Sequence, residues 1–389
     1  MKKILFAALL FLLSLMVCLT SCIAPTYRPT TPARGGGLDD AKAGIAAADG
    51  GDYDKAIRLY TKAIESDELS LEDLSITYKN RGNAWDDKGD SDKAIVDYTK
   101  AIEIDPKLAN AYYNRGIAWG KKGNYDKAIA DCTKAIELDP KDTVAYYNRG
   151  SAWGNKGDSD KAIADYTKAI ELDPKYAKAY YCRGIAWDNK GNYDKAIADC
   201  TKAIELDPKL AEAYLTRGYA WDNKGDYDKA ISDYTKAIEI NPRYALAYYN
   251  RGIAWDNKGD YDKAISDYTK AIELDPKDTV AYYNRGLAWG KKGNYDKAIA
   301  DYTKAIEINP SYAKAYNNRG LAWGNKGNYD KAIADYTKAI EINPKDAKVY
   351  LNRGNAWGKK GDHNKAKADY DKAKEIYSSY KNGKPWREK

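Results

Sequence analysis

The chain has little of the raw material that catalysis and metal binding commonly use. Among its 389 residues there is one histidine, His363, which lies in the segment GDHN. Histidine-based triads and histidine-rich metal sites therefore have almost no residues to draw on. His363 occupies a predicted turn, so we expect a surface residue rather than a metal ligand. The sequence predicts a protein that is not an enzyme and that uses no cofactor and no metal ion.

Two glycine-containing motifs lack the residues that their chemistry requires. The run Gly35-Gly36-Gly37 is not followed by the Lys-Ser/Thr pair of a phosphate-binding loop. Residues 222–228, DNKGDYD, contain acids and a glycine, but not in the order of a calcium loop. Helix capping explains this segment without a bound ion.

A basic stripe is also missing. The net charge of +7 comes from lysines that alternate with Asp and Glu on the expected helix surfaces. Nucleic-acid binding requires basic residues that cluster on one face. The charge pattern therefore argues against a nucleic-acid partner.

What the sequence has in abundance is a repeat of 34 residues, represented by residues 109–142. Tryptophan marks each copy at a constant spacing of 34: Trp85, Trp119, Trp153, Trp187, Trp221, Trp255, Trp289, Trp323 and Trp357. A fixed period of this length indicates one supersecondary unit that is copied along the chain.

Each unit is predicted to be a pair of amphipathic helices. Apolar and small residues recur at helical spacing in two stretches of the unit, 112–119 and 128–136. Between them, Gly123 ends the first helix and Asn124 caps the second, which stops before Pro140. One pair cannot bury its own apolar face, so neighbouring pairs must stack.

These residues resemble the tetratricopeptide repeat (TPR) family. The family pattern of aromatic, small, aromatic, Ala, aromatic, Ala and Pro falls on Tyr112, Gly116, Trp119, Ala128, Cys132, Ala135 and Pro140. The same positions are filled in kind from residue 75 to residue 346, and residues 347–380 keep all but the proline. The resemblance implies an all-α fold, a TPR α-solenoid in which about ten helix-turn-helix repeats form a right-handed superhelix.

One departure from the family pattern is systematic. An arginine stands where the family usually has a large aliphatic residue: Arg81, Arg115, Arg149, Arg183, Arg217, Arg251, Arg285, Arg319 and Arg353. The second helices of the same repeats carry an aspartate: Asp97, Asp131, Asp165, Asp199, Asp233, Asp267, Asp301, Asp335 and Asp369. We predict an ion pair between the helices of each hairpin, because an unpaired, partly buried guanidinium is costly.

The N-terminus is predicted to direct export. Residues 1–3 are charged and residues 4–19 are apolar, which is typical of a secretory signal peptide and too short to favour a spanning helix. The ending LTSC looks like the lipobox of bacterial lipoproteins, which implies cleavage before Cys22 and attachment of lipid to that cysteine. Cys18 is the weaker candidate. Ile23 is not the Asp that signals inner-membrane retention in many bacteria, so we expect a lipoprotein anchored to the outer membrane.

The chain divides into four parts. We predict a signal peptide (1–21), a lipid-anchored disordered linker (22–37) rich in Pro, Thr and Gly, a TPR array (38–380) and a basic tail (381–389). The array begins with a degenerate repeat, 38–71, and ends with a polar repeat, 347–380. Atypical terminal repeats are expected where one face of a stacked array has no neighbour.

Three cysteines lie within the array. Cys132 and Cys200 hold the same register position two repeats apart, which exceeds the roughly 7 Å limit on the Cα separation in a disulfide. Cys182 and Cys200 lie in one repeat, where a bridge or two buried free thiols are both compatible with the sequence. We favour the free thiols.

In the TPR family the first helices line a concave groove, and the resemblance carries that role to the matching positions. They are Tyr113, Asn114, Ile117, Tyr147, Asn148, Tyr181, Ile185, Tyr219, Tyr249, Asn250, Ile253, Tyr283, Asn284 and Leu287. Residues four apart are neighbours on a helix face, so an aromatic and aliphatic surface with amide groups is expected. Such a surface suits an extended or helical peptide. The alternative is that packing against the adjacent first helix consumes some of these side chains.

The family also implies a carboxylate clamp for the C-terminus of a peptide. Lys79, Asn83 and Asn114 match its first members, whereas Val144 and Asn148 stand where its last two cations belong. The clamp is therefore partial.

Taken with the export signal, the groove predicts a lipid-anchored TPR scaffold that gathers proteins in the bacterial cell envelope. Its partners are expected to be proteins or peptides, with the membrane reached through the lipid, and neither nucleic acid nor metal. The alternative is a glycan- or small-ligand-binding module that uses the same groove, because tyrosine and asparagine also stack on and bond to sugars.

Overall fold

The computed structural model describes residues 36–381, with side chains through residue 378. This range contains twenty helices and no strand, which confirms the predicted all-α array of hairpins. Residues 1–35, which include the predicted signal peptide with Cys18 and the predicted lipidation site Cys22, lie outside the described residues, as do residues 382–389. No helix within 36–381 is both long and apolar enough to cross a bilayer.

The helices alternate between the first and second members of hairpins. The first helices are α2 (Gly36–Asp49), α4 (Leu71–Asp87), α6 (Ala109–Lys121), α8 (Thr143–Asn155), α10 (Ala177–Asn189), α12 (Ala211–Lys224), α14 (Ala245–Lys258), α16 (Thr279–Lys291), α18 (Ala313–Asn325) and α20 (Ala347–Lys359). The second helices are α3 (Tyr53–Glu65), α5 (Ser91–Ile104), α7 (Tyr125–Leu138), α9 (Ser159–Leu172), α11 (Tyr193–Leu206), α13 (Tyr227–Ile240), α15 (Tyr261–Leu274), α17 (Tyr295–Ile308), α19 (Tyr329–Ile342) and α21 (His363–Lys381).

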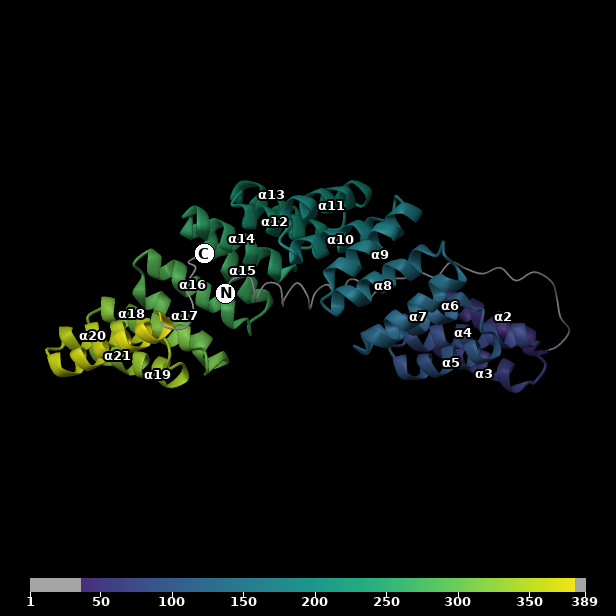
Figure 1. Cartoon of the computed structure of the whole chain (residues 1–389), viewed down its shortest axis with the longest axis horizontal. Helices are drawn as coiled ribbons and strands as arrows, with labels where there is room; N and C mark the ends of the chain where they lie inside the picture. The colour runs from purple at the N-terminus through teal and green to yellow at the C-terminus, as the bar shows by residue number, and fades with distance from the viewer. Residues whose placement is uncertain (1–35, 382–389) are drawn as a thin grey trace. The chain divides into compact units, whose positions relative to one another are not determined.

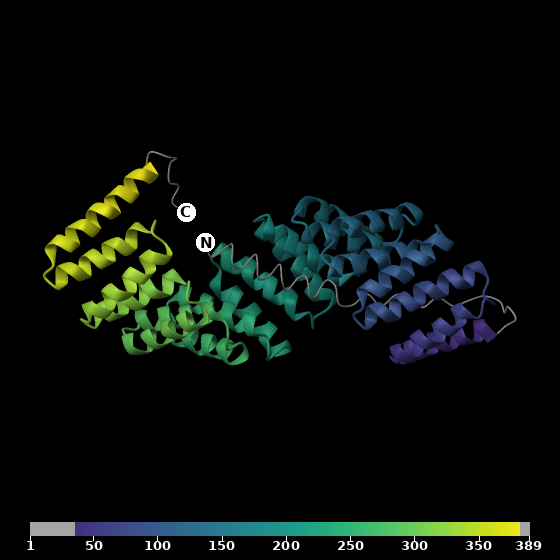
Figure 2. The same ribbon diagram turned by 90° about the horizontal axis from the view of Figure 1, so that it is seen from below.

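The chain separates into two compact units, Met1–Thr216 and Arg217–Lys389, with the border inside α12. Among α2–α11 and among α13–α21, every helix packs on the helix before it and the helix after it. Figures 1 and 2 show the hairpins following one another in chain order within each unit. Successive first helices also touch, as α6 and α8 do in unit 1 and α16 and α18 do in unit 2.

The turn inside each hairpin follows from its glycine and its capping residue. Gly123 has φ +75°, a left-handed conformation that glycine adopts without steric cost. Asn124 then accepts a hydrogen bond from the backbone N–H of Lys127, which satisfies one of the free donors at the start of α7. In unit 2, Asp226 caps α13 in the same way within the segment that superficially resembles a calcium loop.

The helices of a hairpin approach so closely that a side chain larger than hydrogen has no room. A Cβ atom on Gly116 of α6 would lie 2.9 Å from Cys132 Sγ and 3.1 Å from the carbonyl oxygen of Ala128. Ala128, which is 2% exposed, belongs to the same contact. Small residues at these positions therefore set the spacing of α6 and α7.

The repeat tryptophans are half-buried at the edge of this core. In unit 2, Trp323 and Trp357 pack against the buried Ala332 and Ile333. A lysine covers part of each ring, as Lys331 does with its Nζ 4.3 Å from the ring centroid of Trp323. The tryptophans thus join neighbouring hairpins rather than fill the centre of one.

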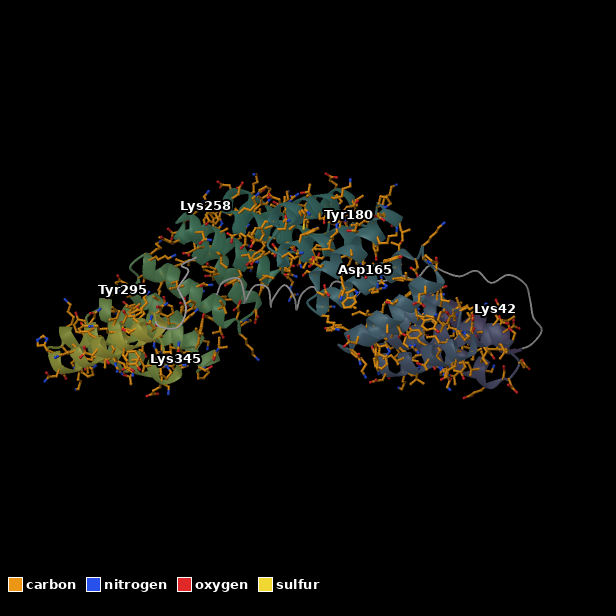
Figure 3. All side chains as sticks on the ribbon, in the orientation of Figure 1. Lys42, Asp165, Tyr180, Lys258, Tyr295 and Lys345 are labelled. Atoms are coloured by element: carbon orange, nitrogen blue, oxygen red, sulfur yellow. The ribbon has the colours of Figure 1, made fainter. Side chains whose placement is uncertain are left out.

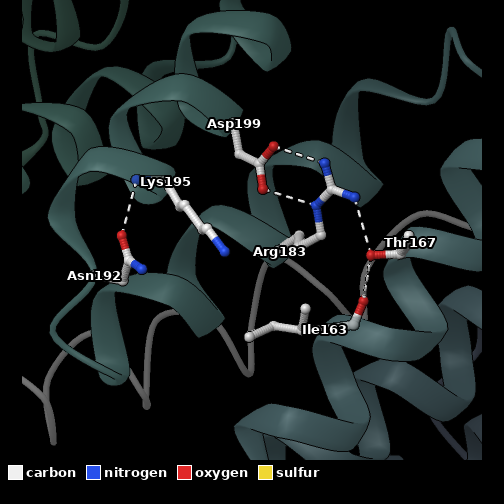
Figure 4. A network of polar contacts seen from close by, with 6 residues as sticks. All are labelled: Ile163, Thr167, Arg183, Asn192, Lys195 and Asp199. Carbon is white, nitrogen blue, oxygen red and sulfur yellow. Dashed lines mark hydrogen bonds and ion pairs between the residues drawn. The ribbon is translucent and has the colours of Figure 1, made fainter.

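The predicted ion pairs between the helices of the hairpins are present in all nine repeats. In Figure 4, Nε and Nη2 of Arg183 donate to Asp199, and Nη1 donates to Thr167 Oγ1 of the preceding hairpin at 3.0 Å. Thr167 Oγ1 in turn donates to the carbonyl oxygen of Ile163. The guanidinium group of Arg183 therefore connects α9, α10 and α11, which the sequence pattern of Arg and Asp alone does not indicate.

Many other charged residues are exposed, as Lys345 is, whereas the buried Asp165 pairs with Arg149 (Figure 3). At the C-terminal end, Tyr370 of α21 is 39% exposed, whereas Tyr336, at the same register position of α19, is 3% exposed because α20 covers it. Lys367 and Lys374 on α21 are exposed where α19 has isoleucines. Polar residues thus replace apolar ones at this end of the described chain.

Candidate functional site

The groove positions of unit 1 are mostly filled by packing within the protein. Tyr147 is 1% exposed, and its ring centroid lies 5.8 Å from that of Tyr166 and 5.0 Å from that of Tyr176. Its hydroxyl lies 3.6 Å from Sγ of Cys182, a residue of the next first helix. These side chains pack against neighbouring helices, which is the alternative to a ligand-binding role for these positions.

Other predicted residues of unit 1 are similarly enclosed. Those that are less than a tenth exposed are Tyr113, Asn114, Tyr181 and Ile185, while Ile117 and Asn148 are half-buried. The amide nitrogen of Asn148 is buried and has no hydrogen-bond partner among the described residues. Cys132, Cys182 and Cys200 are free and buried, so no disulfide joins Cys182 to Cys200.

Two residues of the predicted partial clamp, Asn83 and Asn114, are hydrogen-bonded to each other in unit 1. Asn83 Oδ1 accepts hydrogen bonds from Asn114 Nδ2 and from the Tyr98 hydroxyl, each 2.9 Å long. Lys79, one helical turn before Asn83 on α4, is 9% exposed. Burial lowers the pKa of Lys79 to about 8, and no acid pairs with its ammonium group within the part of the chain that the structure describes. Burying a cation without a counter-ion costs free energy, and a bound anion would reduce that cost.

The first helices of unit 2 present a more open face. Tyr249, Ile253, Tyr283 and Leu287 are half-buried, as is Tyr219 on α12. Leu321 on α18, in register with Leu287, is 37% exposed. Apolar surface is therefore available to a ligand along α14, α16 and α18.

A chain of amide hydrogen bonds crosses this face, and we call it the amide ladder. Asn352 Nδ2 donates to Asn317 Oδ1 at 2.9 Å, Asn317 Nδ2 donates to Asn318 Oδ1 at 3.0 Å, and Asn318 Nδ2 donates to the Tyr283 hydroxyl at 2.8 Å. A further rung joins Asn284 Nδ2 to the Tyr249 hydroxyl at 2.7 Å. The ladder thus consists of Tyr249, Tyr283, Asn284, Asn317, Asn318 and Asn352.

The ladder leaves both donors and acceptors for a ligand. Burial raises the pKa of Tyr283, against the effect of the hydrogen bond from Asn318, so its hydroxyl keeps its proton at neutral pH. That hydroxyl accepts from Asn318 and remains able to donate. The carbonyl oxygens of Asn284 and Asn352 accept no hydrogen bond from the described residues. Asn250, at the start of the same row, is 3% exposed and its amide nitrogen has no partner among those residues.

The residues predicted from the sequence did not include Asn317, Asn318, Leu321 and Asn352. Their register was visible, because Asn318 and Asn352 follow Asn284 at intervals of 34 and Leu321 follows Leu287 at the same interval. Extending the predicted groove by two repeats toward the C-terminus would have included them. Asn317 replaces a tyrosine, and only the geometry shows that its amide continues the row.

These units define a class of protein, the α-helical repeat proteins whose hairpins stack through small residues and whose first helices present a side-chain-lined face. Eight consecutive segments match the family model "Tetratricopeptide repeat": 109–142, 143–176, 177–210, 211–244, 245–278, 279–312, 313–346 and 347–380. Residues 82–123 match the model "TPR repeat". Since the matches cover more than half of the chain, the protein belongs to the tetratricopeptide repeat family. Members of this family generally mediate protein–protein or peptide interactions and are typically non-catalytic.

Solved structures resemble parts of the chain. A tetratricopeptide repeat protein from Parabacteroides merdae is 23% identical, covers 64% of this chain and 98% of its own, and has a TM-score of 0.50. MamA is 34% identical over 42% of this chain and 96% of its own, with a TM-score of 0.41. YrrB, described as a TPR protein with an unusual peptide-binding site, is 28% identical over 48% of this chain and 97% of its own, with a TM-score of 0.42. No curated protein matches the chain.

Proposed function

We propose that this TPR protein is a scaffold that binds an extended segment of a partner protein along the first helices of unit 2. The observation that carries the proposal is the amide ladder on α14, α16, α18 and α20, with the exposed Leu321 beside it. A peptide backbone offers an N–H and a C=O at each residue, and both must be satisfied when water is removed. Tyrosine hydroxyls that donate and asparagine carbonyls that accept meet both needs.

Unit 2 is the better place for this peptide than unit 1. Tyr113, Tyr147 and Tyr181 of unit 1 are at most 7% exposed, so a ligand there would first have to displace side chains that already pack together. On unit 2, Leu287 and Leu321 supply apolar surface next to polar rungs, the combination that lets backbone bonds give affinity and side-chain contacts give specificity.

In unit 1, Lys79 supports a second and separate contact. A carboxylate placed beside its ammonium group would supply the counter-ion that the protein lacks there, and the second hydrogen of the Asn114 amide points to no other described partner. The C-terminal carboxylate of a peptide is the ligand of this chemistry that the family's clamp implies. Replacing Lys79 by Ala should weaken the binding of a peptide with a free C-terminus. It should leave the affinity for the same peptide with an amidated C-terminus unchanged. Equal affinities of both peptides for both proteins would contradict this contact.

The location follows from the proposed lipid anchor at Cys22. A protein with this lipobox would be exported and held at the bacterial outer membrane, with its partners in the cell envelope. Expressed as the full chain, the protein should partition into the detergent phase of Triton X-114 and should move to the aqueous phase when Cys22 is replaced by Ala. Retention of Cys22→Ala in the detergent phase would contradict the anchor.

A selection from a displayed library of random peptides tests the binding face. Peptides enriched by the wild-type protein should bind about fivefold more weakly to Asn318→Ala, because losing one hydrogen-bonding group costs about 1 kcal/mol. Leu321→Ser should weaken the binding of these peptides as well. Asn325→Ala is the matched control, since Asn325 is exposed at the end of the same helix and takes no part in the ladder.

Two outcomes would overturn the peptide proposal. Unchanged affinity in both Asn318→Ala and Leu321→Ser would place the enriched peptides elsewhere on the protein. A failure to enrich any peptide, together with glycans that bind wild type and lose affinity in the same variants, would favour the glycan alternative for this face.

A further inference from the structure

The turn of one hairpin in unit 1 contains a hollow. The hollow has a volume of about 570 Å³ and is lined by Trp153, Lys156, Gly157, Asp158, Ser159, Asp160, Lys161 and Lys190. It lies at the junction of α8 with α9, beside the turn that follows α10. It is distinct from the amide ladder and from the surroundings of Lys79.

The first cause of the hollow is a small residue in place of a tyrosine. Ser159 holds the first position of α9, which is tyrosine in α3, α7, α11, α13, α15, α17 and α19. In two hairpins that have the tyrosine, it belongs to the same apolar cluster as the tryptophans: Tyr329 lies in the cluster that contains Trp323 and Trp357, and Tyr53 lies in the cluster that contains Trp85. At Ser159 no ring fills the corresponding space.

A comparison with α5 shows side chains that can occupy such a space even where serine replaces the tyrosine. α5 also begins with serine, Ser91, but there Lys121 from the next first helix reaches across and bonds Asp86 at 2.7 Å. Ser91 Oγ donates to the other oxygen of that carboxylate at 3.3 Å. In the repeat of Ser159, glycine replaces the aspartate (Gly154) and asparagine replaces the lysine (Asn189). Three positions together therefore leave the hollow open.

The charged groups around the hollow are already neutralised. Lys161 pairs with Asp158 at 3.0 Å, Lys190 pairs with Asp160, and Lys156 pairs with Asp126 of the preceding hairpin. An ionic ligand would have to separate one of these pairs. Trp153 adds an aromatic ring at the wall, with Lys161 Nζ 4.1 Å from its centroid. The surface thus favours a neutral, planar group that can lie against an indole and between ammonium groups.

We propose that this hollow binds an aromatic side chain, a tyrosine or a phenylalanine, that a partner protein presents. The partner's ring would take the place that the chain's own tyrosine takes in the other hairpins, against Trp153 and the aliphatic stem of Lys190. The contact lies in the turns rather than on the first helices, so it would let the array hold a second partner, or a second part of one partner, while the ladder is occupied.

The full chain labelled with 5-fluorotryptophan provides the test by fluorine NMR, with the signal of Trp153 assigned from Trp153→Phe. The probes are N-acetyl-tyrosinamide, N-acetyl-alaninamide and methyl β-glucoside. We expect the tyrosine probe to move the Trp153 signal in a saturable way and the alanine and sugar probes to leave it unmoved. In Ser159→Tyr, which restores the residue of the other hairpins, the shift should disappear while the melting temperature stays the same or rises.

A gain-of-site variant provides the matched control. The repeat of Tyr125 already has glycine and asparagine at the two other positions, Gly120 and Asn155, so Tyr125→Ser should open an equivalent hollow and make the Trp119 signal respond to the tyrosine probe. No saturable shift of Trp153, an unaltered shift in Ser159→Tyr, or an equal shift of Trp119 in the unmodified protein would each overturn the proposal. A response to the glucoside alone would overturn it in favour of a sugar site.

Discussion

Arg183 and Asp199 are joined by two hydrogen bonds of 2.8 Å each, one from Nε and one from Nη2. The side chains of the pair are 18% and 11% exposed. Two parallel bonds fix the guanidinium plane, which leaves Nη1 directed at Thr167 in the hairpin before. The pair therefore holds α10 against α11 within one hairpin, and it also holds α10 against α9 of the preceding hairpin.

Removing one partner of this pair should destabilise the protein. Asp199→Ala leaves a partly buried guanidinium without its counter-ion, and we expect a loss of about 2–3 kcal/mol in the free energy of unfolding by urea. Lys202→Ala is the control on the same helix. Lys202 pairs with Glu205 on the surface, where both side chains are about half exposed, so its loss should cost less than about 0.5 kcal/mol. Equal losses in the two variants would contradict a special role for the arginine pair.

Lys79 should lower the stability of the protein at neutral pH. Its pKa falls from 10.5 to about 8 on folding. Between these values the unfolded state binds more protons than the folded state, so the contribution of Lys79 to stability rises with pH across this window. Below about pH 8 the lysine is charged in both states and the full cost, about 3 kcal/mol, is present. Lys79→Met should therefore stabilise the protein at pH 7.

The pH dependence distinguishes this effect from a general improvement in packing. The stability difference between Lys79→Met and wild type, measured by urea unfolding, should shrink as the pH is raised from 8 to 10.5. A difference that stays constant over that range would show that charge burial at Lys79 is not its source.

Two glycines of α18 should respond in opposite ways to alanine. A Cβ on Gly320 would lie 2.7 Å from Cε1 of Tyr336, whereas a Cβ on Gly324 would meet only the Tyr336 hydroxyl at 3.9 Å. Gly320→Ala should lower the free energy of unfolding by about 1–3 kcal/mol through overpacking. Gly324→Ala should raise it by up to about 1 kcal/mol, because alanine favours the helix. Thermal melts of the two variants show whether each melting temperature falls or rises relative to wild type. An unchanged melting temperature for Gly320→Ala would refute the close contact between the helices.

The cysteines of the array should be unreactive in the folded protein. Cys132 is 1% exposed, and burial raises the pKa of its thiol, so it has neither access nor thiolate character at neutral pH. Iodoacetamide should leave peptides that contain Cys132 unmodified until urea unfolds the protein, as followed by mass spectrometry. Rapid alkylation before unfolding would mean that the hairpin around Cys132 opens readily.

The fold was predictable because it rests on short-range patterns. The spacing of Trp119, the small Gly116 and Ala128, and the stop at Pro140 are all encoded within one repeat, and their repetition determines the rest. The pairing of Arg183 with Asp199 was also predictable, since both belong to one hairpin. Its bond to Thr167 was not, because that residue comes from another repeat.

The site was less predictable, because exposure depends on neighbours that a single helix does not specify. Tyr147 and Tyr283 have the same neighbours in sequence, yet one is 1% exposed and the other is half-buried. Tyr147 meets Cys182 where Tyr283 meets Asn318, so a change in the next repeat alters the surroundings of an unchanged residue. The hollow beside Ser159 likewise depends on Gly154 and Asn189, which no local motif connects.

The hydrogen bond from an arginine to the threonine of the preceding hairpin has a consequence for the length of the protein. Arg115 bonds Thr99 and Arg149 bonds Thr133 in the same manner. If the gene lost one complete unit between such points, Arg149 would find Thr99 in the place of Thr133 and the new junction would have the chemistry of the old one. Recombination in whole units of 34 residues can therefore shorten or extend the molecule while the new junction keeps the same hydrogen bond. A deletion of any other size would put the arginine and the threonine at the junction out of register.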